Sequence, residues 1–431
     1  MAKFKIALIT AGAAGMYCGS CIQDNLLVLA LRQQGHDAIL LPTYTPIRTD
    51  EIDASTPRVF MGGINVYLQQ KFQLFRHMPK WLNRLMDFPP LLRWVSRFAV
   101  STKAEELGDL TLSMLNGQKG YQSSEIADLA DWLKNHFKPD VVHFSNLLLS
   151  GLAVSIKDAT GAKIVGTLQG DDIFLESLPE QFRQQAIQLI RKNSTTFDAI
   201  TATSTSYADR MSLYLGLERE KISTILPGIA FPEFSGSSQG TGKTIGYFAR
   251  ICPEKGFHLL VDAWIELRKK NPQSVIKLKA SGWLGQNQSL FFKQQMAKVN
   301  DANLAKDFDY VSCPDGASKS HFYESVDILC VPSPYLEPKG LYVLEAWSHG
   351  VPVLQPDHGS FPELMEKAVG GGWLFKANQV GNLSEKMDDI FQNQGQIRAQ
   401  GEIGRNAVKN FFNSSRMAEQ VNALYSSLLQ Q

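Results

Sequence analysis

The sequence predicts an α/β protein built from two doubly wound parallel sheets, and two features support this. The chain has 431 residues, more than one hydrophobic core usually contains, so two or three domains are expected. Short apolar segments alternate with longer helical ones, first in the N-terminal half and again in the C-terminal half. Such alternation is typical of parallel sheets with helices on both faces.

The N-terminal half begins with an apolar strand predicted at residues 4–10, followed by a loop of small residues. Glycines in this loop, including Gly19, allow the backbone to approach a phosphate closely, because no Cβ intervenes. A helix then extends to about Gln34 and ends at Gly35. Three further strands are expected at residues 141–144, 162–168 and 199–203.

A segment rich in glycine and serine, residues 231–242, separates the two halves and is predicted to be an interdomain linker. The second series of strands is expected at residues 243–249, 275–280, 309–312, 328–332 and 351–354. The predicted domains are residues 1–228, with a helical insertion at about 65–125, and residues 229–412, followed by a helix at 413–431 that packs back on the first domain. Ligands of doubly wound sheets bind outside the carboxyl ends of the strands, so we expect the two domains to face each other across a cleft that holds the site.

Composition excludes several classes of protein. The net charge of +1 gives no electrostatic basis for binding nucleic acid. The first residues lead directly into a strand without the apolar core of a signal peptide, and the five cysteines are few and scattered, so we expect a cytoplasmic location. Cys18 and Cys21 have the spacing of a redox or metal pair, but no second Cys or His pair accompanies them. No metal site is therefore predicted.

The most informative motif is a pair of carboxylates separated by seven residues, Glu337 and Glu345. It follows an apolar strand, and its second half begins a helix, with Gly340 at the bend. The free amides at a helix start bind anions, and carboxylates accept hydrogen bonds from hydroxyl groups. The motif therefore suits a polyhydroxylated ligand that carries phosphate.

Two cations accompany this motif in the second half. Arg250 ends the first strand of the series, and Lys255 follows five residues later, just before a helix. Arg presents a planar set of donors and Lys a compact charge, a combination that suits a diphosphate. The alternative interpretation is a surface arginine and a lysine at a helix start.

At these residues the chain resembles the family 4 retaining glycosyltransferases, relatives of glycogen synthase and sucrose synthase that have the GT-B fold. The resemblance covers the C-terminal half almost throughout, and it covers the N-terminal half mainly at its strands. The matching segments are Gly35-His36, Asp140–His143, Thr167–Gly170, Thr201–Ser206, Ile225–Ile229, Arg250 with Lys255-Gly256, and Asp327–Leu364 with Glu337 and Glu345 inside it.

The resemblance implies a role for each matching residue. Arg250 and Lys255 would hold the diphosphate of a nucleotide-sugar donor, and the amides of Gly340 and Leu341 would add to them. Glu345 would bind the ribose, whereas Glu337 would face the hydroxyls of the donor sugar. Gly19 would approach the phosphates from the other domain. No cofactor or divalent metal is required, because Arg, Lys and amide dipoles take its place.

On the acceptor side the resemblance points to His143, Gln169 and Asp171, and it is imperfect there. The family often has a second histidine where this chain has Ser145, and often a histidine where this chain has Gln169. Glutamine binds a hydroxyl but accepts no proton. Either the departing phosphate oxygen takes the proton of the acceptor, or Asp171 serves as the base. Asp171 has a second interpretation, the N-cap of a helix.

Residues 71–103 match nothing in the family and carry seven basic residues against Asp87 alone, with aromatic residues among them. They form either a basic amphipathic hairpin in peripheral contact with a membrane or anionic acceptor, or a helical pair docked on the domain with solvated charges.

The sequence thus predicts a metal-independent retaining glycosyltransferase that transfers a sugar from a nucleotide-diphosphate sugar to a carbohydrate or lipid-linked acceptor. Two alternatives remain open: a GT-B nucleotide-sugar epimerase, and a nucleotide-sugar-binding protein without catalysis.

Overall fold

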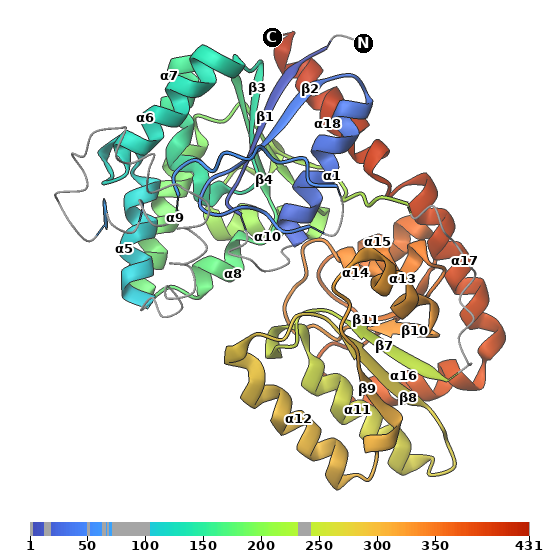
Figure 1. Cartoon of the computed structure of the whole chain (residues 1–431). Coiled ribbons are helices and arrows are strands. Elements are labelled where there is room, and N and C mark those ends of the chain that lie inside the picture. Colours follow the sequence, from blue (N-terminus) through green and yellow to red (C-terminus); the bar gives the residue numbers. More distant parts are fainter. Residues whose placement is uncertain are drawn as a thin grey trace. The chain divides into compact units, whose positions relative to one another are not determined.

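The computed structural model describes residues 3–12, 19–49, 52–62, 66, 69–70, 104–231 and 243–430. They form two compact units, each with its own sheet (Figure 1). Unit 1 comprises Met1–Leu226 and Met417–Gln431, and unit 2 comprises Pro227–Arg416. Most of the predicted linker, the predicted hairpin at 71–103 and Cys18 lie outside the described residues. The domain boundaries and the insertion at 65–125 stay predictions.

The sheet of unit 1 has six parallel strands in the order β2-β1-β3-β4-β5-β6. The strands are β1 (Lys5–Thr10), β2 (Asp37–Pro42), β3 (Val141–Phe144), β4 (Lys163–Leu168), β5 (Ala199–Ala202) and β6 (Ile222–Thr224). The principal helices are α1 (Gly19–Gln33), α5 (Ala104–Leu115), α6 (Ser123–Trp132), α7 (Ala153–Thr160), α8 (Asp171–Glu176), α9 (Glu180–Ser194), α10 (Thr205–Leu215) and α18 (Ser414–Leu429).

Side chains along β3 point alternately to the two faces of this sheet, and their contacts show which helices cover each face. Val142 and Phe144 on β3 are fully buried and pack in one core with apolar residues of α6 and α7. His143 lies between them and faces the opposite side, where it contacts Tyr425 of α18. The last helix of the chain therefore covers the sheet of the N-terminal unit (Figure 1).

The sheet of unit 2 also has six parallel strands, in the order β12-β11-β10-β7-β8-β9. Its strands are β7 (Thr244–Phe248), β8 (Lys277–Ser281), β9 (Phe308–Tyr310), β10 (Ile328–Cys330), β11 (Val353–Pro356) and β12 (Gly372–Phe375). Its principal helices are α11 (Phe257–Lys270), α12 (Ser289–Asp301), α13 (Gly316–Glu324), α14 (Leu341–Ser348), α15 (Phe361–Ala368), α16 (Val380–Gln392) and α17 (Gln394–Asn410).

The predicted fold class is confirmed, and every strand predicted from the sequence is present within a few residues of its expected position. The strand expected at 309–312 lies slightly earlier, at Phe308–Tyr310. Three edge strands, β2, β6 and β12, were not predicted. β6 has only three residues, and β12 follows consecutive glycines, which weaken any strand pattern.

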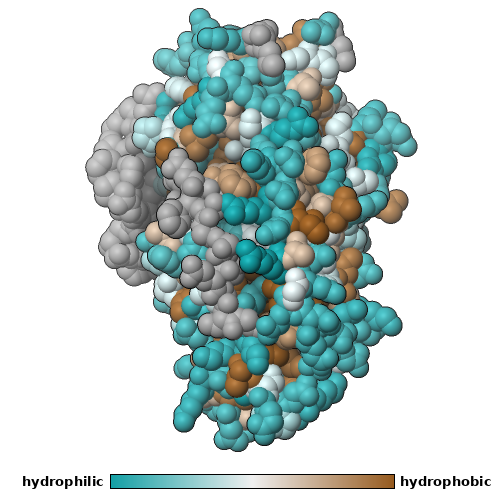
Figure 2. Space-filling view, turned by 90° about the vertical axis from the view of Figure 1, so that its right-hand side faces the viewer, coloured by the Kyte–Doolittle hydropathy of each residue, from teal (hydrophilic) through white to brown (hydrophobic). Residues whose placement is uncertain are grey.

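The apolar residues that the sheets and helices share form the cores. On the face shown in Figure 2, hydrophilic side chains predominate and hydrophobic ones occur in small separate groups. Within the described residues, no helix combines the length and the apolar composition that crossing a membrane requires.

Candidate functional site

The sheet of unit 2 changes winding direction between β7 and β10. From β7 the chain moves outward to β8 and β9, and it then returns to build β10, β11 and β12 on the other side. β7 and β10 are hydrogen-bonded neighbours, with Ile245 opposite Ile328. Loops that leave adjacent strands at such a switch point form the usual ligand site of a doubly wound sheet. The loop after β7 carries Arg250 and Lys255, and the loop after β10 carries Glu337.

Tyr247, a residue of β7, fixes the backbone of the loop that follows this strand. This side chain is fully buried, and its hydroxyl lies 2.8 Å from the carbonyl oxygen of Arg250 and 3.5 Å from that of Lys255. The loop closes at Gly256, where φ is +72° and an added Cβ would lie 1.9 Å from the carbonyl oxygen of Pro332. Glycine is required there because the backbone approaches the end of β10 too closely for a side chain.

A serine joins the two loops. The Ser333 hydroxyl lies 2.8 Å from the carbonyl oxygen of Glu254 and 3.1 Å from that of Tyr335. As a result, Lys255 and Glu337, 82 positions apart in the chain, form an ion pair. Their side chains are only 13% and 8% exposed. The structure therefore brings together two of the residues that the sequence selected, and it buries most of both side chains.

The charge balance around Glu337 favours its ionised form. Burial by itself would raise its pKa, but Lys255, Lys339 and the backbone amide of Gly340 together hold the pKa below its usual value. Lys339 is itself buried. Two lysines therefore surround one carboxylate, a local excess of positive charge that suits a bound anion.

The start of α14 also has the predicted form. Gly340 is the N-cap, with φ of +64°, and the helix begins at Leu341. Glu345 lies one turn further on, and its carboxylate has partners that the sequence did not reveal. The Lys319 ammonium lies 3.2 Å from one oxygen, and the Tyr323 hydroxyl donates to the other at 3.0 Å. Both partners come from α13, in which no sequence motif had indicated a site.

Arg250 differs from Lys255 in its surroundings. Its backbone is fixed by Tyr247, but its side chain is exposed. Within the described ranges, no carboxylate forms an ion pair with it. The structure thus puts Arg250 in the same short loop as Lys255 and leaves its guanidinium at the surface. Gly19 belongs to unit 1, where it is the first residue of α1.

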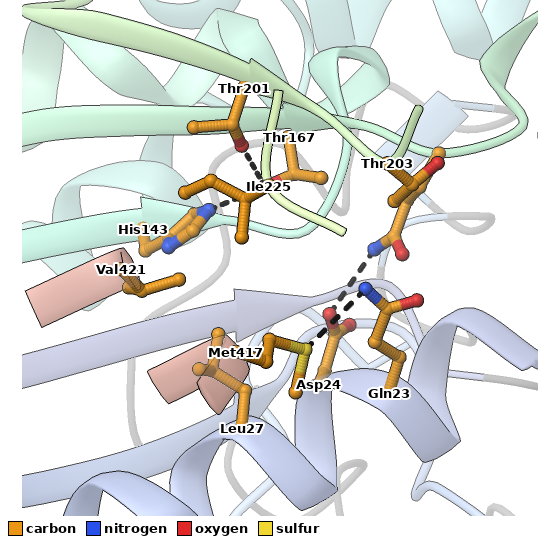
Figure 3. Close-up of a pocket in the computed structure, with 11 residues that line it drawn as sticks. Gln23, Asp24, Leu27, His143, Thr167, Thr201, Thr203, Ile225, Met417 and Val421 are labelled. Atoms are coloured by element: carbon orange, nitrogen blue, oxygen red, sulfur yellow. Dashed lines mark hydrogen bonds between the residues drawn. The ribbon is translucent and has the colours of Figure 1, made fainter. Parts of the chain in front are cut away.

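Unit 1 contains a small polar cavity of about 20 Å³ at the carboxyl ends of β3, β4 and β5 (Figure 3). Residues from the strand ends face residues from α1 and from α18 across it. Its lining consists of Gln23, Asp24, Leu27, His143, Thr167, Gln169, Thr201, Thr203, Ile225, Met417 and Val421. Two of the three predicted acceptor-side residues, His143 and Gln169, are among them.

His143 is engaged at both ring nitrogens. Nδ1 lies 2.6 Å from the Tyr425 hydroxyl, and Nε2 lies 2.6 Å from the Thr167 hydroxyl. The Thr167 hydroxyl is in turn 2.7 Å from that of Thr201. Burial lowers the pKa of His143 to about 4, so the ring is neutral near pH 7. His143 therefore organises the hydrogen bonds of the strand ends and has no ring nitrogen left to accept a proton from a ligand.

Gln169 and Asp171 face different surroundings. The Gln169 side-chain amide donates to Ser145 O at 2.6 Å and to Asp24 Oδ1 at 3.1 Å. The Asp171 carboxylate instead accepts the backbone amides of Leu147 and Gln169, at 2.8 and 3.0 Å, and does not line the cavity. Burial raises the pKa of Asp171 to about 6 against the opposing effect of these amides. The N-cap interpretation of Asp171 is wrong, because Gly170 is the N-cap and α8 begins at Asp171.

Sequence reasoning missed the polar residues that α1 and α18 contribute. Gln23, Asp24 and Asn25 are consecutive and all buried in a helix that is otherwise apolar on its buried side. Asn25 has a structural role, because its amide bonds the backbone of Ile52 and Ala54. A run of three polar residues in an apolar helix was the available signal for Asp24 and Gln23, whereas nothing in the sequence singled out Tyr425.

Profiles of two related families match the chain over 299 consecutive positions in total. The profile described as "Glycosyl transferases group 1" matches residues 232–409, and that of "Glycosyltransferase Family 4" matches residues 111–231. Together they cover nearly all of unit 2 and the second half of unit 1's main segment.

Curated relatives are distant. The putative colanic acid biosynthesis glycosyltransferase WcaL of Escherichia coli is 24% identical over 310 residues, which are 68% of this chain and 71% of that protein. The spore coat protein SA of Bacillus subtilis is 20% identical over 184 residues, 42% of this chain, and the match spans only 48% of that protein. Mannosylfructose-phosphate synthase of Agrobacterium fabrum is 24% identical over 38% of each chain.

Solved structures agree over the whole chain. Sucrose-phosphate synthase of Thermosynechococcus elongatus superposes with a TM-score of 0.70 at 18% identity and covers 99% of both chains. HepE of Anabaena, solved in complex with UDP, superposes with a TM-score of 0.69 at 16% identity, over 98% of this chain and all of the other. At such identities the likeness establishes the fold, which is GT-B as predicted.

Proposed function

The chain belongs to the glycosyltransferases of group 1 and family 4, and from this premise we propose that it is a retaining glycosyltransferase. It transfers a sugar from a nucleotide-diphosphate sugar to a carbohydrate or lipid-linked acceptor. The observation that carries the proposal is the Lys255–Glu337 pair at the switch point of the unit 2 sheet, next to the N-terminus of α14. A cation, a carboxylate and a helix start at one sheet edge suit a ligand that is both phosphorylated and hydroxylated.

The donor diphosphate binds Lys255 and Arg250 together with the amides of Gly340 and Leu341. When the glycosidic bond breaks, negative charge develops on the departing phosphate oxygen, and these preorganised donors stabilise it. Removing a comparable donor costs about 2.7–4 kcal/mol of transition-state stabilisation in other enzymes. Such an arrangement needs no divalent metal.

The carboxylates recognise hydroxyl groups. Glu337, which is held ionised by its lysines, accepts hydrogen bonds from the donor sugar. Glu345 binds the ribose, and Lys319 and Tyr323 fix its orientation. Gly19, the first residue of α1, remains a candidate contact of the donor phosphates because it has no Cβ.

Transfer with retention breaks the bond between the anomeric carbon and the phosphate oxygen and forms a bond to the acceptor oxygen on the same face. The proton of the acceptor hydroxyl passes to the departing phosphate oxygen. This route requires no base from the protein. This route is consistent with the surroundings of two acceptor-side residues, since His143 has both ring nitrogens engaged and Asp171 accepts hydrogen bonds from backbone amides.

HepE was solved with UDP-glucose as well as with UDP, so UDP-sugars are the first donors to test. The release of nucleoside diphosphate from UDP-, GDP- and ADP-sugars is measured with and without added glycosides. A transferase releases the diphosphate faster when acceptor is present. An epimerase instead yields an isomeric nucleotide sugar, and a non-catalytic protein binds the donor without product.

The variants R250A and K255A should abolish turnover and weaken donor binding, because each removes one positive side chain that contacts the diphosphate. K269A is the matched control, since Lys269 is an exposed lysine near the end of α11. Unchanged turnover in both R250A and K255A, measured under conditions where K269A behaves as wild type, would refute the site.

A further inference from the structure

The Lys255 ammonium lies near two tyrosine rings as well as near Glu337. Its Nζ is 5.5 Å from the centroid of the Tyr342 ring and 6.0 Å from the centroid of the Tyr335 ring. An ammonium is attracted to a ring face within about 6 Å, and more strongly where water is excluded. The Lys255 side chain is mostly buried and Tyr342 is buried, so the contact with Tyr342 meets both conditions. Tyr335 lies at the limit of the range.

Tyr342 also lies next to the anion of the pair. Its hydroxyl is 3.5 Å from Glu337 Oε2, the same oxygen that accepts the Lys255 ammonium. A hydrogen bond of that length is weak. Burial raises the pKa of Tyr342 well above its usual value, so the hydroxyl stays protonated and brings no negative charge to Glu337. The ring is therefore the part of Tyr342 that acts most strongly on Lys255.

The position of this ring is fixed by the fold of unit 2. Tyr342 is the second residue of α14, directly after Leu341 and the N-cap Gly340, whose amides the proposed function assigns to the diphosphate. Its ring packs against that of Phe361 on α15, with the ring centroids 6.2 Å apart. Phe361 is itself buried. Tyr342 thus connects a helix start that is held in the core with a lysine that comes from a loop.

A lysine in a loop has much conformational freedom to lose when a ligand orders it, because its side chain is long and flexible. Within the described residues, Nζ of Lys255 has one hydrogen-bond acceptor, Glu337, although an ammonium carries three N–H donors. A ring face restricts the position of the ammonium without using an N–H group. The remaining donors stay available to an anion.

We propose that Tyr342 is a positioning residue of the donor site: its ring holds the Lys255 ammonium at the start of α14 and so prepares it to bind the diphosphate. The proposal rests on the proposed function and adds to it a residue that acts through Lys255 and touches no substrate. The effect of the ring should therefore depend on the presence of Lys255, whichever base the diphosphate carries.

The test measures the binding of nucleoside diphosphates to the full-length protein, so that it does not depend on turnover. Saturation-transfer NMR, which detects weak binding, compares UDP, GDP and ADP on the wild type, and the one that binds most tightly is the probe for the variants. Y342L and Y342M both remove the ring, so a folding defect in one of them does not decide the result. Each should weaken binding about three- to tenfold, the cost of ordering one flexible side chain.

Conservative and control variants separate positioning from packing. Y342F keeps the ring and should bind within about twofold of the wild type, because only a weak hydrogen bond is lost. F391L removes a ring of similar burial from α16 and should bind as the wild type does. When Y342L is added to K255M, it should change the affinity by less than about twofold, because the lysine that it positions is gone. A purely structural role would weaken binding equally with and without Lys255.

Four results would overturn the proposal. The first is that Y342L and Y342M bind the probe as tightly as the wild type does. The second is that Y342F weakens binding as much as they do, and the third is that Y342L has the same effect in K255M as in the wild type. The fourth is that none of the three diphosphates binds the wild type. Failure of the proposed function has a different signature, namely diphosphate binding that depends on Tyr342 and Lys255 in a protein that releases no nucleoside diphosphate from any nucleotide sugar.

Discussion

Replacing Lys255 by methionine tests the Lys255–Glu337 pair without reference to substrate. The substitution keeps the length and most of the apolar contacts of the side chain but removes its charge. Glu337 is then a buried carboxylate that has lost its ion-pair partner. Removal of one partner of a buried pair typically costs about 3–5 kcal/mol, because the remaining charge is no longer compensated.

The structure places the expected cost at the lower end of that range. Lys339 and the Gly340 amide still stabilise the Glu337 carboxylate after the substitution, so about 3 kcal/mol is expected. Unit 2 has about 190 residues, and in a unit of that size 1 kcal/mol lowers the melting temperature by about 2–4 °C. The transition of unit 2 should therefore move down by about 6–12 °C.

The pH dependence of the destabilisation distinguishes the loss of an ion pair from a packing defect, which would not change with pH. The pKa of Glu337 lies below its usual value in the folded protein, so the pair stabilises the fold above the unfolded pKa of about 4.3 and loses this contribution as the pH falls through the folded value. Below that point the wild type retains a buried lysine without an anion, whereas the K255M variant has neither charge. The difference between them should shrink as the pH falls below about 4.

Differential scanning calorimetry of the full-length chain at pH 7 and at lower pH provides the measurement. K269M is the control for loss of a lysine charge at an exposed position. The double variant K255M/E337Q leaves no buried charge in the pair and should recover much of the stability lost in K255M. The reasoning fails if K255M melts as the wild type does at pH 7, or if its destabilisation is independent of pH and of the second substitution.

Three further outcomes follow from other parts of the chain. G256A should unfold more easily than G161A by at least about 2 kcal/mol in urea. Both glycines have left-handed φ, but an added Cβ meets a main-chain oxygen only at Gly256. Y425F should cost about 1–3 kcal/mol in the same assay, because it leaves Nδ1 of His143 buried without the hydroxyl with which it shares a hydrogen bond. D171N should flatten the pH dependence of stability between about pH 4 and 6. The folded pKa of Asp171 is raised to about 6, so the wild type loses stability as the pH rises through that value.

The sequence predicted the architecture well because the information is local. An apolar run of four to six residues, a glycine-containing loop and a helical segment recur along the chain, and each identifies one β-α unit. The strands that were missed lack this signal. β6 is too short to show any period, whereas the apolar run within β2 was available and was not used.

The donor side was predictable for a related reason. Arg250, Lys255, Glu337 and Gly340 each lie in a loop that directly follows a strand, so topology alone directs them to one edge of the sheet. What the sequence did not contain is the order of the strands. Lys255 meets Glu337 because β7 and β10 are neighbours, and this depends on long-range pairing that no local pattern reports. Lys319 was missed because its helix, α13, carries no motif of its own.

The acceptor side was the hardest part of the site to predict. Gln169 seemed to weaken the interpretation of the protein as an enzyme, but its hydrogen bonds explain why a glutamine occupies this position. Gln169 stands where the family often has histidine, which raised the alternative of a protein without catalysis. Its side-chain nitrogen donates two hydrogen bonds, to Asp24 and to the backbone of Ser145. A single histidine nitrogen carries at most one proton and cannot make both bonds. Glutamine thus satisfies two buried acceptors at once, so the departure from the family pattern is explained by the neighbouring residues of this chain and does not in itself favour loss of catalysis.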